Sequence, residues 1–391
     1  MDALIIRGNQ LREYIRNNRN WLLCFFVYFC LFKYDWLSQL AFFDYLYTYS
    51  RYCLCFVFVF LYLKEKRKPS VLLISTLILC AWMFLDLFRN TGFYIHSYRY
   101  AFLFLVSALA TEYFAKKDFR SMIRGLMLNC EIAIYFDTAS KLYNLYVNHL
   151  PRGGTFFGYY NFTTLISLPA ICTAVLYMTL FKNYRRSVPL LFFSILLCFL
   201  STAGTPRGAI IGFMIVVIIE YLLFYKLKLT RTVRPCLWIL AATLFGFFLV
   251  FLYRPGQLTL LDSFIVNVLH RSLDFTYRTD IWKESLNLIS EHPVIGYGYS
   301  IYVLDKPHAH NMYLEYLLLY GLIGMVLFVI FNLVYIIEIE KRKDDIYKIV
   351  FAGLLFAMHL TFIVDYYIKC HLFVIMIFVI YSFYIDGIDE T

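Results

Sequence analysis

The chain has 391 residues, of which 61% are hydrophobic and only 16% are charged, and its mean hydropathy is +0.66. A soluble globular domain carries about 25% charged residues, so this composition excludes an ordinary soluble protein. The formal net charge of +10 would suit a nucleic-acid-binding protein. However, the Lys and Arg residues gather in short clusters between apolar runs, which is the pattern of cytoplasmic loops in membrane proteins. We therefore expect an all-α integral membrane protein with no nucleic-acid partner.

Apolar runs of membrane-spanning length recur along the whole chain and predict about twelve transmembrane helices. The fifth of them is the weakest because it carries Glu131, Asp137 and Lys141. We expect no cleavable signal peptide, since no small-residue cleavage site follows the first run. The expected spans cover residues 21–39, 41–63, 70–88, 98–115, 125–147, 161–181, 188–204, 208–225, 236–253, 312–337, 349–366 and 369–385.

Basic residues fill every second connection between these spans, and such connections face the cytoplasm. Twelve spans then place both termini in the cytoplasm and residues 254–311 on the outer face. No internal repeat is visible, which disfavours an inverted-repeat transporter. We expect one polytopic domain over residues 1–391, with residues 254–311 as an outer loop inserted between the ninth and tenth spans.

Residues 278–324 interrupt the apolar pattern with polar, aromatic and charged residues. Arg278 opens a short amphipathic helix, Pro293 ends it, and Gly296 and Gly298 favour a turn. The next span begins just after a His-Ala-His-Asn sequence. We interpret this stretch as the active-site face of a membrane enzyme and the remaining spans as its scaffold.

Arginine and histidine side chains on the expected outer face suit the binding of a phosphate-bearing lipid. Guanidinium groups grip phosphate oxygens bidentately, and a histidine near neutral pH can take a proton from an attacking hydroxyl. Each arginine alone could equally anchor a span at the lipid headgroups. The candidates are Arg152, Arg207, Arg271, Arg278, His308 and His310.

Three further residues of this stretch have two interpretations each. Asn311 could contact substrate or cap the helix that starts at Met312, and Glu315 could orient His310 or act as an acid in the first helical turn. Trp282 could stack on a sugar or serve as an interface aromatic. His308 and His310 have no acid or third histidine at a usual ligand spacing, and the ten cysteines lie in or beside spans. We therefore expect neither a metal site nor a disulfide framework.

In this order the motifs resemble the O-antigen ligase superfamily, which includes bacterial O-antigen ligases and related polysaccharide polymerases. The resemblance covers residues 150–335. Pro206 stands where the family often has a serine. The motifs are Arg207-Gly208 at a span start, Arg278 with Trp282 four residues on, the sequence HPVIGYGYS over 292–300, and His310-Asn311 followed by Gly321 and Gly324.

The resemblance implies a GT-C-like fold in the bacterial inner membrane and an inverting, metal-independent glycosyl transfer at its periplasmic face, with no cofactor. The donor would be a glycan on undecaprenyl diphosphate. The acceptor would be lipid A-core in a ligase, or a second lipid-linked repeat unit in a polymerase. Mapped onto this chain, Arg207 and Arg278 would hold the diphosphate and His310 would activate the acceptor hydroxyl. Arg152 would assist, in a loop similar to the family's segment with Gly158 and Asn161.

The motif spacing favours an O-antigen ligase over an O-antigen or capsular polysaccharide polymerase. The spacing from His310-Asn311 to Gly321 and Gly324 is typical of ligases. The aromatic spans and the compact outer loop also suit a polymerase. A polysaccharide transporter would share the hydropathy but would concentrate ionisable residues and broken helices near the middle of the membrane.

Overall fold

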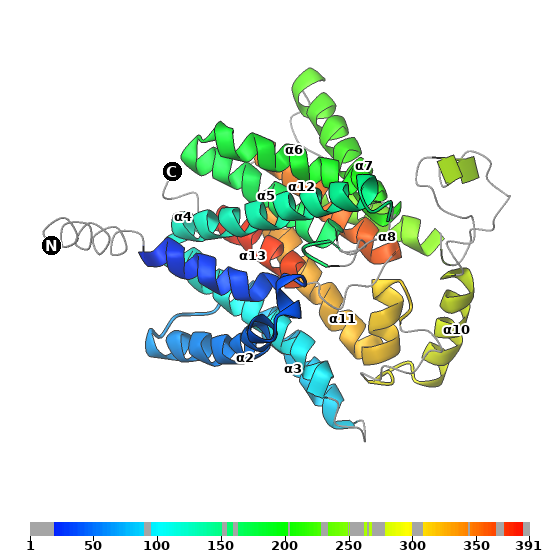
Figure 1. Cartoon of the computed structure of the whole chain (residues 1–391). Coiled ribbons are helices and arrows are strands. Elements are labelled where there is room, and N and C mark those ends of the chain that lie inside the picture. Colours follow the sequence, from blue (N-terminus) through cyan, green and yellow to red (C-terminus); the bar gives the residue numbers. More distant parts are fainter. Residues whose placement is uncertain are drawn as a thin grey trace, which may run out of the picture.

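The structure is a computed structural model, and its described part is entirely helical (Figure 1). It describes residues 19–89, 95–150, 155–158, 163–201, 204–227, 234–248, 250, 262–263, 266–267, 278–298, 308–342, 345–364 and 371–385. The candidate residues Arg152 and Arg271, and Asn161 in the Gly-Asn segment, lie outside these ranges.

The described helices follow the expected apolar runs closely. Two short irregular helices accompany them, the 3₁₀ turn η1 (Leu37–Gln39) and the π-helical turn η3 (Leu222–Lys226). The α-helices are Arg19–Phe32, α2 (Ala41–Lys64), α3 (Val71–Arg89), α4 (Ile95–Tyr146), α5 (Thr163–Phe181), α6 (Tyr184–Leu200), α7 (Gly204–Tyr221), α8 (Pro235–Phe247), α10 (Arg278–Glu291), α11 (Met312–Glu340), α12 (Ile346–Val364) and α13 (His371–Ile385).

Several of these helices can cross a membrane, as a multi-pass membrane protein requires. By length and composition, five helices of the described residues qualify, namely Ala41–Lys64, Thr163–Phe181, Thr205–Phe224, Met312–Glu340 and Ile346–Ile363. Shorter apolar helices accompany them at Arg19–Phe32, Val71–Leu85, Pro235–Phe247 and His371–Ile385.

The first expected span, 21–39, extends beyond the C-terminal end of the helix that the structure shows. Its helix stops at Phe32 because Lys33 has a φ of +46°, a left-handed conformation that cannot continue a right-handed helix. The chain then turns through η1 before α2 begins.

The fourth and fifth expected spans are joined within α4 by one non-helical residue, Asp118, instead of by a loop. The Asp118 carboxylate accepts a hydrogen bond from the Ser121 amide (2.9 Å) and so caps the second half of α4. The Arg19–Phe32 helix contacts both halves, because Tyr28 donates to Thr111 (3.2 Å) and Asn129 donates to the Phe25 carbonyl (3.0 Å). The two halves therefore run side by side in opposite directions, as two spans should.

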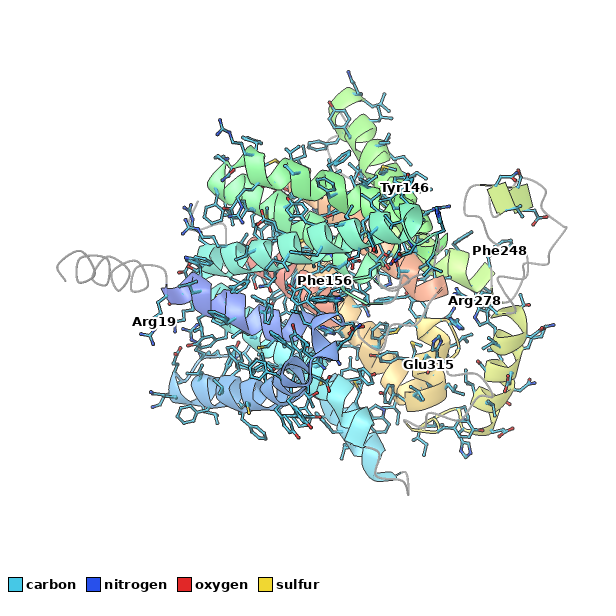
Figure 2. The ribbon with its side chains drawn as sticks, in the orientation of Figure 1. Arg19, Tyr146, Phe156, Phe248, Arg278 and Glu315 are labelled. Atoms are coloured by element: carbon cyan, nitrogen blue, oxygen red, sulfur yellow. The ribbon has the colours of Figure 1, made fainter. Side chains whose placement is uncertain are left out.

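Two central helices, α5 and α13, are buried on nearly all sides. The helix α13 packs against α4, α5 and α11, and α12 packs against α7 and α8. Figure 2 shows Arg19 at one end of the bundle and Tyr146, Phe248 and Arg278 at the other. We call this second end the site end, because α10 and the start of α11 lie there.

Candidate active site

The helix α10 presents one face to the protein, as its sequence predicts. Arg278, Ile281, Trp282 and Ser285 are buried, and this i, i+3, i+4, i+7 spacing is that of a single helical stripe. Arg278 is 6% exposed and Trp282 is 1% exposed. Because residues four apart lie on the same face, Arg278 and Trp282 share the side of α10 that packs on α11.

The backbone of Ala309 is held on both sides by buried side chains. The indole Nε1 of Trp282 donates to the Ala309 carbonyl (3.1 Å). The Ala309 amide donates to Oε2 of Glu315 (2.7 Å). Trp282 and Glu315 thus position the chain just before His310, and the burial of Trp282 supports positioning over sugar stacking.

Asn311 fixes the chain just after His310. Its Oδ1 accepts hydrogen bonds from the amides of Tyr313 (3.0 Å) and Leu314 (3.1 Å), which makes it the N-cap of α11. Its Nδ2 donates to the Ile363 carbonyl at the end of α12 (2.9 Å). The capping interpretation of Asn311 therefore describes its geometry, and its amide also ties α11 to α12.

His310 lies between these two fixed residues in a left-handed conformation, with a φ of +50°. Such a conformation costs a non-glycine residue about 1–3 kcal/mol and persists only where surrounding contacts enforce it. Its ring packs edge-on against the ring of His308, with centroids 4.0 Å apart and planes at 72°. Both predicted histidines therefore lie together, beside the buried face of α10.

The helix α11 is broken at Gly321, which has a φ of +62° and a ψ of −166°. This break was not predicted from the sequence. It leaves backbone groups on either side of Gly321 without partners inside the helix, and a buried backbone group must find another partner.

The segment 292–298, which contains most of the HPVIGYGYS motif, supplies those partners. The amides of Tyr297 and Gly298 donate to the carbonyls of Leu318 (2.8 Å) and Leu319 (2.7 Å). In return, the amides of Leu322 and Ile323 donate to the carbonyls of Pro293 (2.9 Å) and Val294 (3.2 Å).

Three glycines permit this close approach. A Cβ on Gly296 would lie 2.6 Å from the Gly321 amide nitrogen, and a Cβ on Gly321 would lie 2.5 Å from the Gly296 amide nitrogen. A Cβ on Gly324 would lie 3.3 Å from Nε1 of Trp82, which donates to the third freed carbonyl, that of Tyr320 (3.2 Å). The motif glycines thus join the end of α10 to α11, which carries the histidines at its start.

Tyr297 adds a side-chain contact to this junction. Its hydroxyl donates to the Glu291 carboxylate at the end of α10 (2.6 Å), and this bond raises the pKa of Tyr297 to about 12. Tyr297 therefore remains a neutral donor over the physiological pH range.

Arg207 reaches the same end of the bundle on α7. Its Nε donates to the Phe199 carbonyl near the end of α6 (3.3 Å). A Cβ on Gly212 of α7 would meet Cδ1 of Leu360, so this part of α7 lies directly against the last turns of α12. Since Ile363 also holds Asn311, the end of α12 links the Arg207 helix to the His310 backbone.

An apolar groove of about 520 Å³ opens between α8 and α11 and follows α11 from Asn311 to Ile336. Apolar side chains such as Leu240, Phe247 and Leu317 line most of it. Polar groups reach it at Thr243, Asn311, Tyr313, Asn332 and His359.

A buried polar network beside this groove was also missed by the sequence analysis. The Tyr313 hydroxyl bonds to Nδ1 of His359 (2.6 Å), and the Tyr335 hydroxyl bonds to Nε2 of His359 (3.4 Å). Tyr335 also donates to Oδ1 of Asn332 (2.9 Å). A histidine within an apolar run was the available signal, because polar groups inside a membrane are rare and usually paired.

Within the described ranges, no three or more His, Cys, Asp or Glu side chains are arranged to hold a metal ion. The described arrangement offers arginine cations, two neighbouring histidines and an adjoining apolar groove.

Residues 189–329 match a family model described as O-antigen ligase. No curated protein matches the chain. The matched residues begin in α6 and end in α11, so they include Arg207, Arg278 and His310. Members of this ligase and polymerase family are membrane enzymes that act on lipid-linked glycans. Residues 189–329 of the chain are therefore similar to the O-antigen ligase family.

Proposed function

We propose that this chain is an O-antigen ligase, an inverting and metal-independent glycosyltransferase of the bacterial inner membrane. It transfers polysaccharide from undecaprenyl diphosphate to a hydroxyl of lipid A-core at the periplasmic face. The acceptor oxygen attacks the anomeric carbon and loses its proton to His310. The bond from that carbon to the diphosphate breaks, and its electron pair leaves with the diphosphate, whose charge Arg207 and Arg278 stabilise.

The observation that carries this proposal is the backbone of His310. It has a left-handed conformation between Ala309, held by Trp282 and Glu315, and Asn311, held by the end of α12. Strained backbone that is enforced on both sides occurs preferentially at active sites. A general base must be held in place relative to its proton donor. The contacts on both sides of His310 meet this requirement.

The apolar groove supports a lipid-linked donor. It begins at Asn311, directly after His310, and continues along α11 to Ile336. A polyprenyl chain lying in it would place its diphosphate at the site end, where Arg207 and Arg278 stand. Apolar walls of this length suit a hydrocarbon chain better than a free sugar, which needs hydrogen-bonding partners.

Broken helices such as α11 are typical of transporters. Here the carbonyls of Leu318, Leu319 and Tyr320 accept hydrogen bonds from Tyr297, Gly298 and Trp82. They are therefore engaged by the protein itself, whereas a transporter uses the freed groups of a broken helix to bind its ion or substrate. This difference favours an enzyme over a transporter.

Variants of the two central residues test the proposal. His310→Ala and Arg278→Ala should each abolish consumption of a polyprenyl-diphosphate-linked glycan, with the protein still inserted in the membrane. His292→Ala is the matched control, because His292 is an exposed histidine of the same region that packs on Tyr297. Full activity of the His310 or Arg278 variant at equal membrane abundance would remove that residue from the mechanism.

A polymerase is the second candidate, since the same donor chemistry serves both reactions and the family match covers both. It would use a second lipid-linked repeat unit as the acceptor. The two reactions differ in product, because only the ligase joins the glycan to lipid A-core.

A further inference from the structure

The break in α11 folds its first half back along its second half. In a continuous helix, a rise of about 1.5 Å per residue would separate Tyr313 from Phe328 by about 22 Å. The centroids of the two rings instead lie 6.4 Å apart. The ring of Tyr316 comes closer still, with its centroid 4.4 Å from that of Phe328. Residues 312–320 therefore run beside the following turns of α11, and His310 lies just before this folded-back half.

The helix α12 holds the start of the folded-back half at two points. Nδ2 of Asn311 donates to the Ile363 carbonyl (2.9 Å). The Tyr313 hydroxyl bonds to Nδ1 of His359 (2.6 Å), and His359 and Ile363 lie about one turn apart on α12. Because both held residues follow His310 within one helical turn of chain, α12 constrains the backbone that carries this histidine.

The hydrogen-bond directions are fixed in the His359 network, which consists of the side chains of Tyr313, His359, Tyr335 and Asn332. The Phe328 carbonyl accepts from Nδ2 of Asn332 (2.7 Å), so Oδ1 of Asn332 faces Tyr335. Since Oδ1 can only accept, the Tyr335 hydroxyl donates to it (2.9 Å). The Tyr335 oxygen then accepts from Nε2 of His359 (3.4 Å). Nδ1 of His359 accepts in turn from the Tyr313 hydroxyl (2.6 Å), and the ring carries its proton on Nε2.

The His359 network is suited to holding α11 in place rather than to binding a polar ligand. Its hydrogen bonds run between the protein's own groups and join both halves of α11 to α12. His359 is 2% exposed, and hydrogen bonds in such a low-dielectric setting are strong and costly to leave unmade. Tyr313 and His359 also line the apolar groove, so a donor lipid would lie beside the residues that hold His310.

We propose that Tyr313 and His359 are positioning residues that hold His310 in place for proton transfer. This inference rests on the proposed function, since it assigns the means by which the proposed base is oriented. His359 acts through Tyr313, and Tyr313 acts through the backbone that joins it to His310. A displacement of about 1 Å near the reacting atoms can lower a rate about a hundredfold, so one hydrogen bond at this point is enough to affect transfer.

Steady-state transfer kinetics, per amount of folded full-length protein, test the positioning role. Tyr313→Phe keeps the ring on Phe328 but removes the hydroxyl that bonds to His359. We expect kcat to fall about ten- to hundredfold, with the donor KM changed less than about twofold because the groove keeps its apolar wall. His359→Leu should give the same result. His359→Gln should retain most of kcat, since a carboxamide can accept from Tyr313 and donate to Tyr335.

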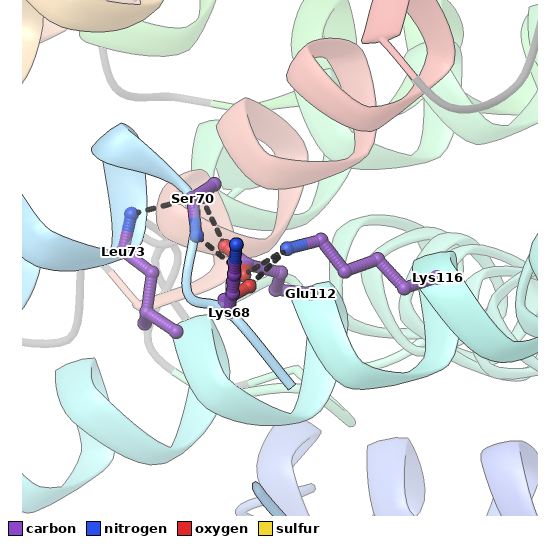
Figure 3. Close-up of polar contacts among 5 residues, drawn as sticks. All are labelled: Lys68, Ser70, Leu73, Glu112 and Lys116. Carbon is purple, nitrogen blue, oxygen red and sulfur yellow. Dashed lines mark hydrogen bonds and ion pairs between the residues drawn. The ribbon is translucent and has the colours of Figure 1, made fainter. Parts of the chain in front are cut away.

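A second buried network supplies the matched control. The Ser70 hydroxyl bonds to the Glu112 carboxylate of α4, which also accepts from the Ser70 amide (2.9 Å) and from Lys116 (2.7 Å) (Figure 3). This network lies toward the end of the bundle opposite the site, because Asp118 just beyond it accepts from Asn20 (3.2 Å). Ser70→Ala removes one hydroxyl from a contact between two segments, as Tyr313→Phe does, and should leave kcat and KM unchanged.

Solid-state nitrogen NMR of full-length protein with isotope-labelled histidine tests the His359 network without requiring turnover. The signal that disappears in His359→Gln identifies His359. At neutral pH we expect Nε2 to carry the proton and Nδ1 to carry the lone pair that accepts from Tyr313. Tyr313→Phe should shift the Nδ1 resonance, whereas Ser70→Ala should leave it unchanged.

These measurements separate failure of the positioning role from failure of the proposed function. Wild-type kcat in folded Tyr313→Phe would overturn the positioning role alone, while transfer by the wild type would stand. An equal fall in kcat in Ser70→Ala would also overturn it, because any lost hydroxyl would then act alike. A proton on Nδ1 of His359 would overturn the network. No transfer by the wild type, with His359 in the expected tautomer, would refute the proposed function and the positioning role together. If His359→Leu does not fold, Tyr313→Phe and His359→Gln decide the outcome.

Discussion

Replacing Gly321 by alanine tests the junction between segment 292–298 and the broken helix α11. The φ of +62° and ψ of −166° at Gly321 lie in a region that is essentially restricted to glycine. The new Cβ would lie 2.5 Å from the amide nitrogens of Ile295 and Gly296 and would also collide with the Val294 carbonyl oxygen. All three are backbone atoms, so relief requires the segment to move away from α11.

The loss of folding stability follows from the contacts that would break if segment 292–298 moved away from α11. Four backbone hydrogen bonds join the segment to α11. At a net 0.5–1.5 kcal/mol each, their loss costs about 2–6 kcal/mol, and the strained backbone adds about 1–3 kcal/mol if the segment stays in place. The substitution should also shift the first half of α11, and a displacement of about 1 Å can reduce a catalytic rate about a hundredfold.

Thermal unfolding in detergent and glycan transfer at equal protein amounts measure the two effects. Gly353→Ala is the matched control, because Gly353 lies in the regular helix α12 and its Cβ would meet side-chain atoms of Phe213 and Val217 at 3.0 Å and the Phe213 carbonyl oxygen at 3.2 Å, without a closer backbone clash. We expect Gly321→Ala to unfold at a much lower temperature than this control and to lose most activity. An unchanged unfolding temperature together with normal transfer would refute the proposed junction.

Four further outcomes follow from the site. Asn311→Ala should lower stability by about 1 kcal/mol or more, and Asn311→Ser by less because a serine hydroxyl can still cap the helix; equal denaturation midpoints would contradict this. Glu315→Leu should cost about 1–3 kcal/mol by leaving the buried Ala309 amide unpaired, while Glu315→Gln should retain most stability in the same assay. Arg207→Lys should transfer glycan poorly, since an ammonium cannot make a bidentate phosphate contact; wild-type rates would make Arg207 a simple charge anchor. EDTA should leave the transfer rate unchanged, and loss of activity restored by a divalent ion would contradict a metal-independent mechanism.

Features that depend on local chemistry were predictable from the sequence. The amphipathic stripe and the proline after it predicted α10, and Asn311 was a recognisable cap for α11. The family resemblance placed Arg207, Arg278 and His310 in one region, and the family match includes all three. Their catalytic roles, with those of Arg152 and Arg271, stay predictions.

Features that depend on contacts between distant segments were not predictable. The break at Gly321 exists because segment 292–298 supplies partners for the freed backbone groups, and a regular apolar run gives no sign of that pairing. The groups that hold Ala309 come from α10 and from the first turn of α11. The sequence alone also does not show that Asp137 of α4 accepts a hydrogen bond from the distant Phe157 amide (2.6 Å).

The most direct test of the central claim is reconstitution of the purified protein in liposomes with an undecaprenyl-diphosphate-linked repeat unit, with and without lipid A-core. Products are resolved by gel and by mass. We predict glycan joined to lipid A-core only when that acceptor is present. Longer polyprenyl-linked glycans without lipid A-core would contradict the ligase and identify a polymerase, and no product from a protein shown to be folded would contradict glycosyl transfer itself.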